Sequence, residues 1–420
     1  MELKNIHNDP RLIRRFIPLN TPGVLVLGVF LLIGVLNSTN TLLKPVGLIS
    51  IILLLITSKF FLFWYVICRS QARVPRIVVS FLFTLIMIFV VYSIKFISTP
   101  VTFHGIKIIY QLVSVVGFFL FVLLLDWGDK TIMILSRCVV VLVVVSLLFL
   151  VYNYTGRRSV NLNVFGAILY HLLFFLVFAF SVSHKKLQSL FWGLTIVVCL
   201  FAIFATNARS LWIAIIAGLL TFYSWSFIIK NKLIFRLYFV FLFLIIGLFV
   251  VLYPYLNTIP VFIDFNHQIY EITGKNFFSQ RERLWIVLIE AIKEQPITGY
   301  GSNVLPTDII GKEVSAHNLY LQIFLQVGLV GLLLFLFMLW QIWEILRLGS
   351  LNLQVRITGA FFIGILVHQA FEVSLTQNHL SIGMIQWTII GIGINRCTRC
   401  HDRGISIASK DLSLKGGVLT

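Results

Sequence analysis

The chain has 420 residues, of which 59% are hydrophobic and only 11% are charged, and its mean hydropathy is +0.99. No soluble domain of this length approaches such a composition, so the sequence predicts an integral membrane protein. The formal charge of +18 would suit a nucleic-acid partner in a soluble chain. In a membrane protein the placement of charge matters more than its sum, and we expect no nucleic-acid partner.

Apolar windows long enough to cross a bilayer recur along most of the chain and predict an all-α, polytopic membrane protein with about twelve transmembrane helices. The windows lie near residues 21–37, 43–67, 77–97, 106–125, 132–152, 163–183, 187–205, 210–229, 234–253, 318–343, 357–376 and 380–395. The polar, basic residues 1–19 precede the first window, and no small-residue cleavage site follows it. We therefore interpret that window as a span and not as a signal peptide.

The distribution of Lys and Arg predicts the orientation. Most of these residues fall in alternate loops, which agrees with a cytoplasmic N-terminus under the positive-inside rule. The chain then divides into about nine N-terminal transmembrane helices (1–253), a large periplasmic loop (254–317), about three further helices (318–395) and a basic cytoplasmic tail (396–420). We expect a multi-pass protein of the bacterial inner membrane with both termini in the cytoplasm.

Five arginines fall on the outer side, against this bias. They are Arg157, Arg158, Arg209, Arg281 and Arg283. Each one alone can be interpreted as an interfacial side chain that snorkels toward lipid headgroups. Together, beside a histidine in the same polar loop, they indicate a site for an anionic, lipid-linked substrate. Arginine suits this task because its planar guanidinium stays charged and binds phosphate oxygens in pairs.

His317 stands where the polar loop meets an apolar helix, with Ser315 as the expected N-cap. The positive end of a helix dipole favours the neutral imidazole, which can accept a proton from an attacking hydroxyl. The structural alternative is a histidine that only hydrogen-bonds to loop backbone. Asn318 and Gln322 are four residues apart, so they share a helix face that could extend a polar site.

These residues fall in sequence motifs. A polar turn with an arginine before an apolar helix appears as Thr206-Asn-Ala-Arg209-Ser-Leu-Trp212. Two loop motifs follow, Arg281-Glu-Arg-Leu-Trp285 and Pro296-Ile-Thr-Gly299-Tyr-Gly301. The last part is His317-Asn-Leu-Tyr-Leu-Gln322 with Gly328-Leu-Val-Gly331 downstream, whose glycines we interpret as positions of close helix packing. In this order, the motifs resemble those of the O-antigen ligase and polymerase superfamily of bacterial inner membranes.

The resemblance implies a metal-independent glycosyltransferase without a cofactor. Such enzymes transfer a glycan from undecaprenyl diphosphate to an acceptor hydroxyl in the periplasm. The acceptor is a sugar of the lipid A core in ligases and another repeat unit in polymerases. By similarity, Arg209 and Arg281 would bind the diphosphate and stabilise the leaving group, and His317 would activate the acceptor. Further substrate-binding candidates are Arg283, Asn318, Gln322, Arg157 and Arg158.

Two alternatives remain open at the level of sequence. Arg283 also fits a polymerase-like spacing to Gly299, although the alignment through Trp285 favours Arg281. A single large outer loop and an intact His-Asn helix start favour a ligase over a polymerase. From another class, a transporter of lipid-linked glycans would need charged residues along a path through the spans, which are nearly free of charge.

For three further features we favour interpretations without a catalytic or cofactor-binding role. Cys397-Thr-Arg-Cys400-His401 has the spacing of covalent haem attachment, but it lies in a tail that the topology places in the cytoplasm. Glu372 and His379 flank the last outward turn. They could line the site, but we interpret them as residues of a hydrated interface.

Overall fold

The computed structural model describes residues 21–38, 44–68, 76–97, 103–125, 127–154, 161–273, 276, 278, 280–312, 314–349 and 352–415. The regular elements in these ranges are all helices, which confirms the all-α class. Twelve of them overlap the expected windows. These are α1 (Thr21–Gly34), α2 (Lys44–Cys68), α3 (Arg76–Ile97), α4 (Phe103–Leu124), α5 (Asp129–Tyr154), α6 (Leu162–Ser181), α7 (Lys186–Ala205), α8 (Arg209–Ile228), α9 (Lys232–Leu256), α13 (Leu319–Leu348), α14 (Leu353–His368) and α15 (Leu380–Lys415).

Eight helices in the described part of the chain are long and apolar enough to cross a membrane. They are α2, α4, α5, α6, α7, α8, α9 and α13, and they confirm a polytopic membrane protein. The expected count of twelve spans is not confirmed, since α1 has 14 residues and passes into the 3-10 turn η3 (Val35–Ser38), and α14 has only 16. In the apolar windows, 78% of α6 is buried inside the protein, whereas only 22% of α7 and of α9 is buried.

The window at 357–376 is wrong at its C-terminal end, because α14 stops at His368. The backbone beyond it forms a buried turn that leads to α15. Gln369 closes this turn, since its Oε1 accepts hydrogen bonds from the backbone N–H groups of Ser374 at 3.1 Å and Leu375 at 3.0 Å. Buried non-helical backbone is tolerated where protein groups form its hydrogen bonds. An average of hydropathy over a window cannot show this.

Helices α8 and α14 pack closely and antiparallel through small residues. A Cβ on Gly218 of α8 would lie 3.0 Å from the carbonyl oxygen of Ala360 on α14, and a Cβ on Gly364 of α14 would lie 2.8 Å from that of Ala214 on α8. Such close approach is the main source of helix association where lipid supplies no hydrophobic driving force. The two contacts fix the register of α8 against α14.

An aromatic cluster joins α8, α9, α13 and α14. The ring of Trp343 stacks on Phe235 with centroids 4.2 Å apart, and its Nε1 donates to the carbonyl oxygen of the same residue at 2.9 Å. Trp225 and Phe362 contact the same indole. At this end of α9, Arg236 Nε forms an ion pair with Glu344 Oε1 at 2.7 Å. The cluster packs α8 and α13 together near one end. The opposite ends of these two helices carry Arg209 and His317.

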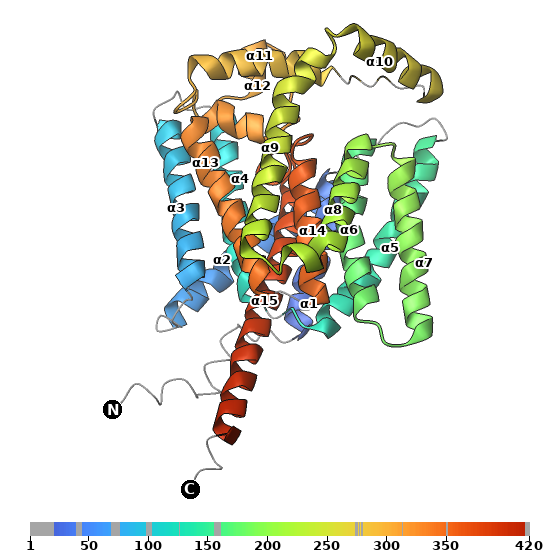
Figure 1. The fold of residues 1–420 in the computed structure, drawn as a ribbon, viewed down its shortest axis with the longest axis vertical. Coiled ribbons are helices and arrows are strands. Elements are labelled where there is room, and N and C mark those ends of the chain that lie inside the picture. Colours follow the sequence, from blue (N-terminus) through green and yellow to red (C-terminus); the bar gives the residue numbers. More distant parts are fainter. Residues whose placement is uncertain are drawn as a thin grey trace.

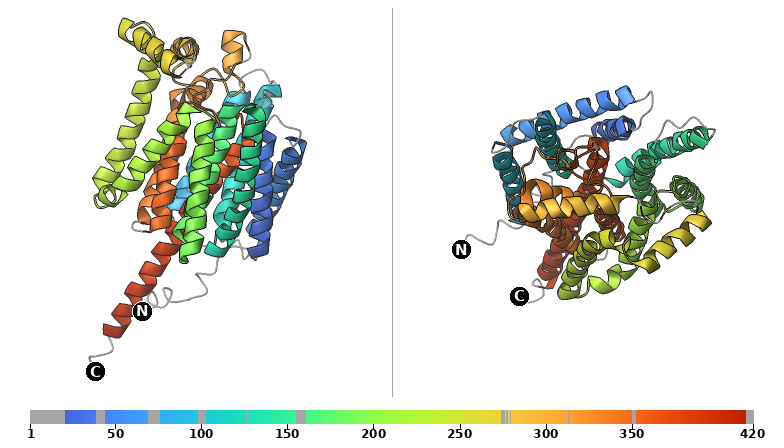
Figure 2. Two further views of the ribbon diagram at one scale, coloured as in Figure 1. Left: turned by 90° about the vertical axis from the view of Figure 1, so that its right-hand side faces the viewer. Right: turned by 90° about the horizontal axis from the view of Figure 1, so that it is seen from above.

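Three short helices lie across one end of the bundle, opposite the C-terminal end of α15 (Figure 1). They are α10 (Pro260–Thr273), α11 (Arg281–Glu294) and α12 (Pro306–Ile310). Seen from above, α11 lies over the bundle itself (Figure 2). Helix α9 continues through Pro254 and ends at Leu256, before these three short helices begin.

Candidate functional site

Glu372 joins the two strongest candidates of the polar loop. Its Oε1 lies 3.2 Å from Nη2 of Arg281, and its Oε2 lies 3.4 Å from Nδ1 of His317. Glu372 comes from the turn between α14 and α15, Arg281 begins α11, and His317 precedes α13. The carboxylate and Arg281 are largely buried, whereas 41% of the His317 side chain is exposed. A base, a guanidinium and a carboxylate thus meet where His317 is open to solvent.

Trp285, one helical turn after Arg281, fixes the position of α11. Its side chain is fully buried, and its Nε1 donates to the carbonyl oxygen of Ala316 at 2.9 Å. The rings of Phe249 and Tyr253, from the end of α9, pack against it. The indole therefore fixes the start of α11 against the residue that precedes His317.

The N-cap of α13 is Asn318, so the expectation that Ser315 caps this helix is wrong. Asn318 Oδ1 accepts from the N–H of Leu321 at 3.0 Å, and its Nδ2 donates to the carbonyl oxygen of Ala370 at 3.0 Å. A fully buried side chain with these two bonds ties α13 to the turn that carries Glu372. Ser315 Oγ instead accepts from the N–H of His317 at 3.3 Å.

Four non-glycine residues in the described part of the chain have left-handed backbone, and each one shortly precedes a helix. They are Asn207 (φ 55°), Gln280 (φ 65°), His317 (φ 49°) and Asn378 (φ 57°), before α8, α11, α13 and α15. This conformation costs an L-residue about 1–2 kcal/mol. Backbone strain of this kind concentrates at functional sites, and here three of the four residues lie in or directly beside the motifs, whereas Asn378 does not.

The Pro296–Gly301 motif docks into a break in α13. The N–H groups of Tyr300 and Gly301 donate to the carbonyl oxygens of Leu325 and Gln326, both at 2.9 Å. Gly328 has φ 64° and ψ −164°, which interrupts the helix at this point. The expectation that Gly328 serves close helix packing is therefore wrong, since its neighbour is the loop.

The two motif glycines meet each other in this break. A Cβ on Gly299 would lie 2.6 Å from the N atom of Gly328, and a Cβ on Gly328 would lie 2.3 Å from the carbonyl oxygen of Ile297. Lys95 of α3 donates from Nζ to the carbonyl oxygen of Gly299 at 3.0 Å. We call this contact between the Gly299 loop and the helix break at Gly328 the glycine joint. It fixes the direction of the part of α13 that follows Gly328.

Arg209 is the first residue of α8 and is exposed. Gly218 lies against Ala360, and Ala214, four residues earlier on α8, lies against Gly364, four residues later on α14. Each step back along α8 is thus matched by one step forward along α14. Continued by five residues, to the residue just after α14, this antiparallel register sets Arg209 level with Gln369. The carbonyl oxygen of Gln369 accepts from the N–H of Leu319 at 2.9 Å, so Arg209 lies at the same depth as the start of α13.

The remaining candidates occupy different places. Arg283 is exposed on α11, and Gln322 is buried in α13, with no partner for its Nε2 among the described residues. Arg157 and Arg158 lie outside the described residues. Among the residues that are described, no group of three His, Cys, Asp or Glu side chains is arranged to hold a metal ion.

Sequence reasoning assigned Glu372 to a hydrated interface, and the structure places it at the centre of the candidate site. It also did not single out His368, a buried residue four positions earlier whose Nδ1 has no partner among the described residues. The one available signal for Glu372 was its rarity, because the chain has only 15 acidic residues. An acid between two apolar helices is unusual in such a chain.

The charges around Glu372 favour an ionised carboxylate. Burial raises the pKa of Glu372, but the hydrogen bond from His317 and the charges of His317, Arg281 and His368 outweigh it, so the pKa lies below its ordinary value. Burial lowers the pKa of His379; Glu372 opposes this shift, and the charges of His317 and Lys107 add to it. The site therefore holds one ionised acid among several basic groups.

Comparison with protein-family models matches residues 194–336 to the family described as O-Antigen ligase (Wzy_C). The matched range runs from the middle of α7 into α13 and contains Arg209, Arg281 and His317. Comparison with curated proteins found no match. Residues 194–336 of this all-α, polytopic membrane protein thus match the O-antigen ligase family, in agreement with the resemblance of their motifs.

Proposed function

We propose that the protein transfers an O-antigen polysaccharide from undecaprenyl diphosphate to a sugar hydroxyl of the lipid A core. One observation carries the proposal: Glu372 contacts both Arg281 and His317, each of which lies in the region that matches the O-antigen ligase family. A cation for a phosphate leaving group and a base for an acceptor hydroxyl are the two groups that such a transfer needs.

Arg281 and Arg209 bind the diphosphate in this proposal. Arg281 gives one hydrogen bond to Glu372 through Nη2, and a guanidinium has five N–H donors, so most of its donors can bind phosphate oxygens. The exposed Arg209 stands at the same depth on α8. Both cations stabilise the negative charge that develops on the leaving diphosphate. By the family resemblance, these arginines act in place of a metal ion. Arg283 is a secondary contact with the donor.

His317 acts as the general base. With Nδ1 toward the ionised Glu372, the neutral imidazole carries its proton on Nδ1 and leaves Nε2 as the acceptor. The carboxylate orients the ring and stabilises the imidazolium that forms when Nε2 takes the hydroxyl proton. The 3.4 Å contact is long for a hydrogen bond, as catalytic contacts often are before the substrate binds.

The transfer is then a single displacement. Nε2 of His317 takes the proton from the acceptor hydroxyl, and the oxygen attacks the anomeric carbon of the donor sugar. The bond between that carbon and the diphosphate oxygen breaks, and undecaprenyl diphosphate leaves. Arg281 and Arg209 stabilise the negative charge on its oxygens. Attack from the face opposite the leaving group inverts the anomeric carbon without a glycosyl-enzyme intermediate.

The proposed location is the inner membrane of a bacterium, with the site on the periplasmic face and both termini in the cytoplasm. The basic loops and the position of α10–α12 opposite the end of α15 support this orientation (Figure 1). A reporter fused after residue 300 should be active only in the periplasm, and one fused after Lys410 only in the cytoplasm. A cytoplasmic signal at residue 300 would place the site on the wrong side for this donor.

The lipopolysaccharide of a bacterial strain that lacks this protein distinguishes a ligase from a polymerase. A ligase predicts a lipid A core without any added repeat, while polymer accumulates on undecaprenyl diphosphate. A core capped by a single repeat unit would instead assign the polymerase activity of the same superfamily. Normal banding would contradict both.

A further inference from the structure

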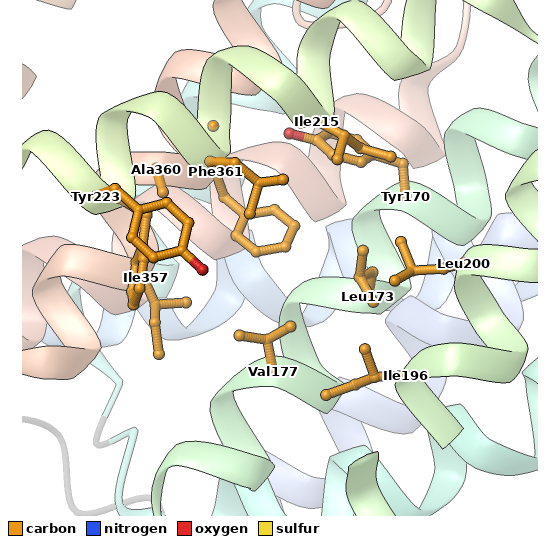
Figure 3. A pocket seen from close by; sticks show the side chains of 13 residues that line it. Tyr170, Leu173, Val177, Ile196, Leu200, Ile215, Tyr223, Ile357, Ala360 and Phe361 are labelled. Atoms are coloured by element: carbon orange, nitrogen blue, oxygen red, sulfur yellow. The ribbon is translucent and has the colours of Figure 1, made fainter. Parts of the chain in front are cut away.

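An apolar cavity of about 240 Å³ lies within the membrane-spanning part of the protein, between α6, α7, α8 and α14. Figure 3 shows apolar side chains that converge on this space from several helices. Ile196 and Leu200 line the cavity from α7, Leu173 lines it from α6, and Phe361 lines it from α14. An engineered apolar cavity of roughly 150 Å³ stays dry and binds benzene. This cavity therefore suits a hydrocarbon and not a sugar or water.

The cavity exists because two consecutive helices separate. Helix α7 packs against α6 and α5, whereas α8 packs mainly against α14, and α7 stands at the edge of the bundle (Figure 1). The close contact of Gly218 with the Ala360 carbonyl oxygen holds α8 on α14 and away from α7. At the rim, Leu219 is 49% exposed and Tyr223 is 74% exposed, so the cavity opens sideways toward lipid.

The position of the cavity connects it to the candidate site. Helix α8 begins with Arg209 and contributes Ile215, Gly218 and Tyr223 to the lining. At a rise of about 1.5 Å per residue, these residues lie about 9 to 21 Å below Arg209 along the helix. A lipid whose phosphates contact Arg209 would thus place the first part of its tail beside the cavity. The α7 and α8 walls also fall within the matched family region, 194–336.

We infer that this cavity binds the polyprenyl chain of the lipid-linked donor. The inference rests on the proposed function, because Arg209 at the head of α8 must hold the diphosphate. The branched isoprenoid needs a wide, apolar space, and the cavity provides one in line with that head. Leu200 of α7, Ile215 of α8 and Tyr170 of α6 all line this path (Figure 3).

The test uses the purified full-length protein in phospholipid nanodiscs and a polyprenyl diphosphate with a diazirine in its isoprenoid chain and no glycan. After irradiation, labelled residues are mapped by mass spectrometry. Labelling should concentrate on the cavity-lining residues of α7 and α8. Leu200→Trp fills the cavity and should reduce this labelling at least fivefold. Leu194→Trp is the matched control, because Leu194 is on the same helix but 59% exposed and outside the lining; it should label like the wild type.

Ile196→Trp fills the same cavity from another position and keeps the result from depending on one variant. The inference is overturned if both tryptophan variants elute as folded protein and label like the wild type. It is also overturned if a phosphatidylglycerol with a diazirine in its acyl chain labels the cavity as strongly as the polyprenyl probe. Because the probe has no glycan, labelling does not depend on turnover. Labelled protein that transfers no glycan would count against the proposed function alone.

Discussion

Glu372 lies 55 residues after His317 in the chain, yet its Oε2 is 3.4 Å from Nδ1 of that histidine. The same carboxylate holds Arg281 through its other oxygen at 3.2 Å. One side chain thus determines the position of the proposed base and of the proposed phosphate ligand. The contact makes Glu372 a positioning residue, since it acts on the substrates through its two neighbours.

Glu372→Gln should lower the turnover of glycan transfer by at least about tenfold, because the amide keeps the size of the side chain but cannot stabilise the imidazolium. The measurement is the single-turnover rate with purified protein and a lipid-linked donor. Glu290→Gln on α11 is the matched control, since Glu290 pairs with Lys293 on the exposed side of that helix. Equal rates for both variants would remove Glu372 from the mechanism.

The pH dependence of stability follows from the same carboxylate. The pKa of Glu372 is lower in the folded protein than its ordinary value of 4.5, so folding favours the ionised form. Its contribution to stability is present above the unfolded-state pKa and is lost as the pH falls through the folded-state pKa. The melting temperature of the wild type should therefore fall more steeply than that of Glu372→Gln as the pH falls below the ordinary value of 4.5. Parallel curves would contradict this coupling.

Substitution of the arginines separates donor binding from packing. Arg281→Ala or Arg209→Ala should lower transfer by about 10²–10³-fold, as expected for loss of a group that stabilises transition-state charge. Lysine should rescue only in part, because it lacks the planar fork. Arg283→Ala should have a much smaller effect on the rate, which is measured in the same assay. An essential Arg283 with a dispensable Arg281 would show that the loop motif is aligned wrongly and would favour a polymerase.

The double variant Arg281→Ala/Glu372→Gln tests whether the pair is also structural. Arg281→Ala alone leaves a largely buried carboxylate with one cation fewer, which is costly. Removing the charge of Glu372 as well should restore much of the thermal stability but none of the transfer. A double variant that is less stable than either single variant would contradict this.

The glycine joint predicts a loss of stability with a built-in control. Gly299→Ala requires left-handed backbone at φ +66° and brings a Cβ to 2.6 Å from the Gly328 N atom. Gly311→Ala requires φ +72° but has no heavy atom within 4 Å, so it should cost only about 1–2 kcal/mol of backbone strain. Gly299→Ala should therefore unfold at a clearly lower temperature in detergent. Equal melting temperatures would mean that the joint does not carry α13.

Hydropathy predicted the transmembrane helices well where the chain is uniformly apolar. Helices α6 to α9 begin and end within a few residues of the expected windows. The prediction failed after His368, where the side chain of Gln369 satisfies a buried turn within an apolar sequence. A window average treats such a glutamine as a small penalty, although it determines where α14 ends.

The motifs singled out two residues of the candidate site but did not indicate how the site is built. Arg281 and His317 could be chosen from residue type and position, since an exposed base and a guanidinium in an outer loop are informative on their own. Glu372 acquires its role only from contacts with residues 91 and 55 positions away. The docking of the Pro296–Gly301 loop into the break at Gly328 also joins distant segments. No local pattern encodes such contacts.

The turnover of three His317 variants tests the central claim most directly. His317→Ala should lower the rate of transfer by about 10²–10⁴-fold, the usual contribution of a positioned general base, while binding of the donor changes little. His317→Gln and His317→Asn can replace a hydrogen bond but cannot take the proton, so both should be as slow as alanine. Rates near that of the wild type for the glutamine and asparagine variants would contradict the account and leave His317 as a structural residue before α13.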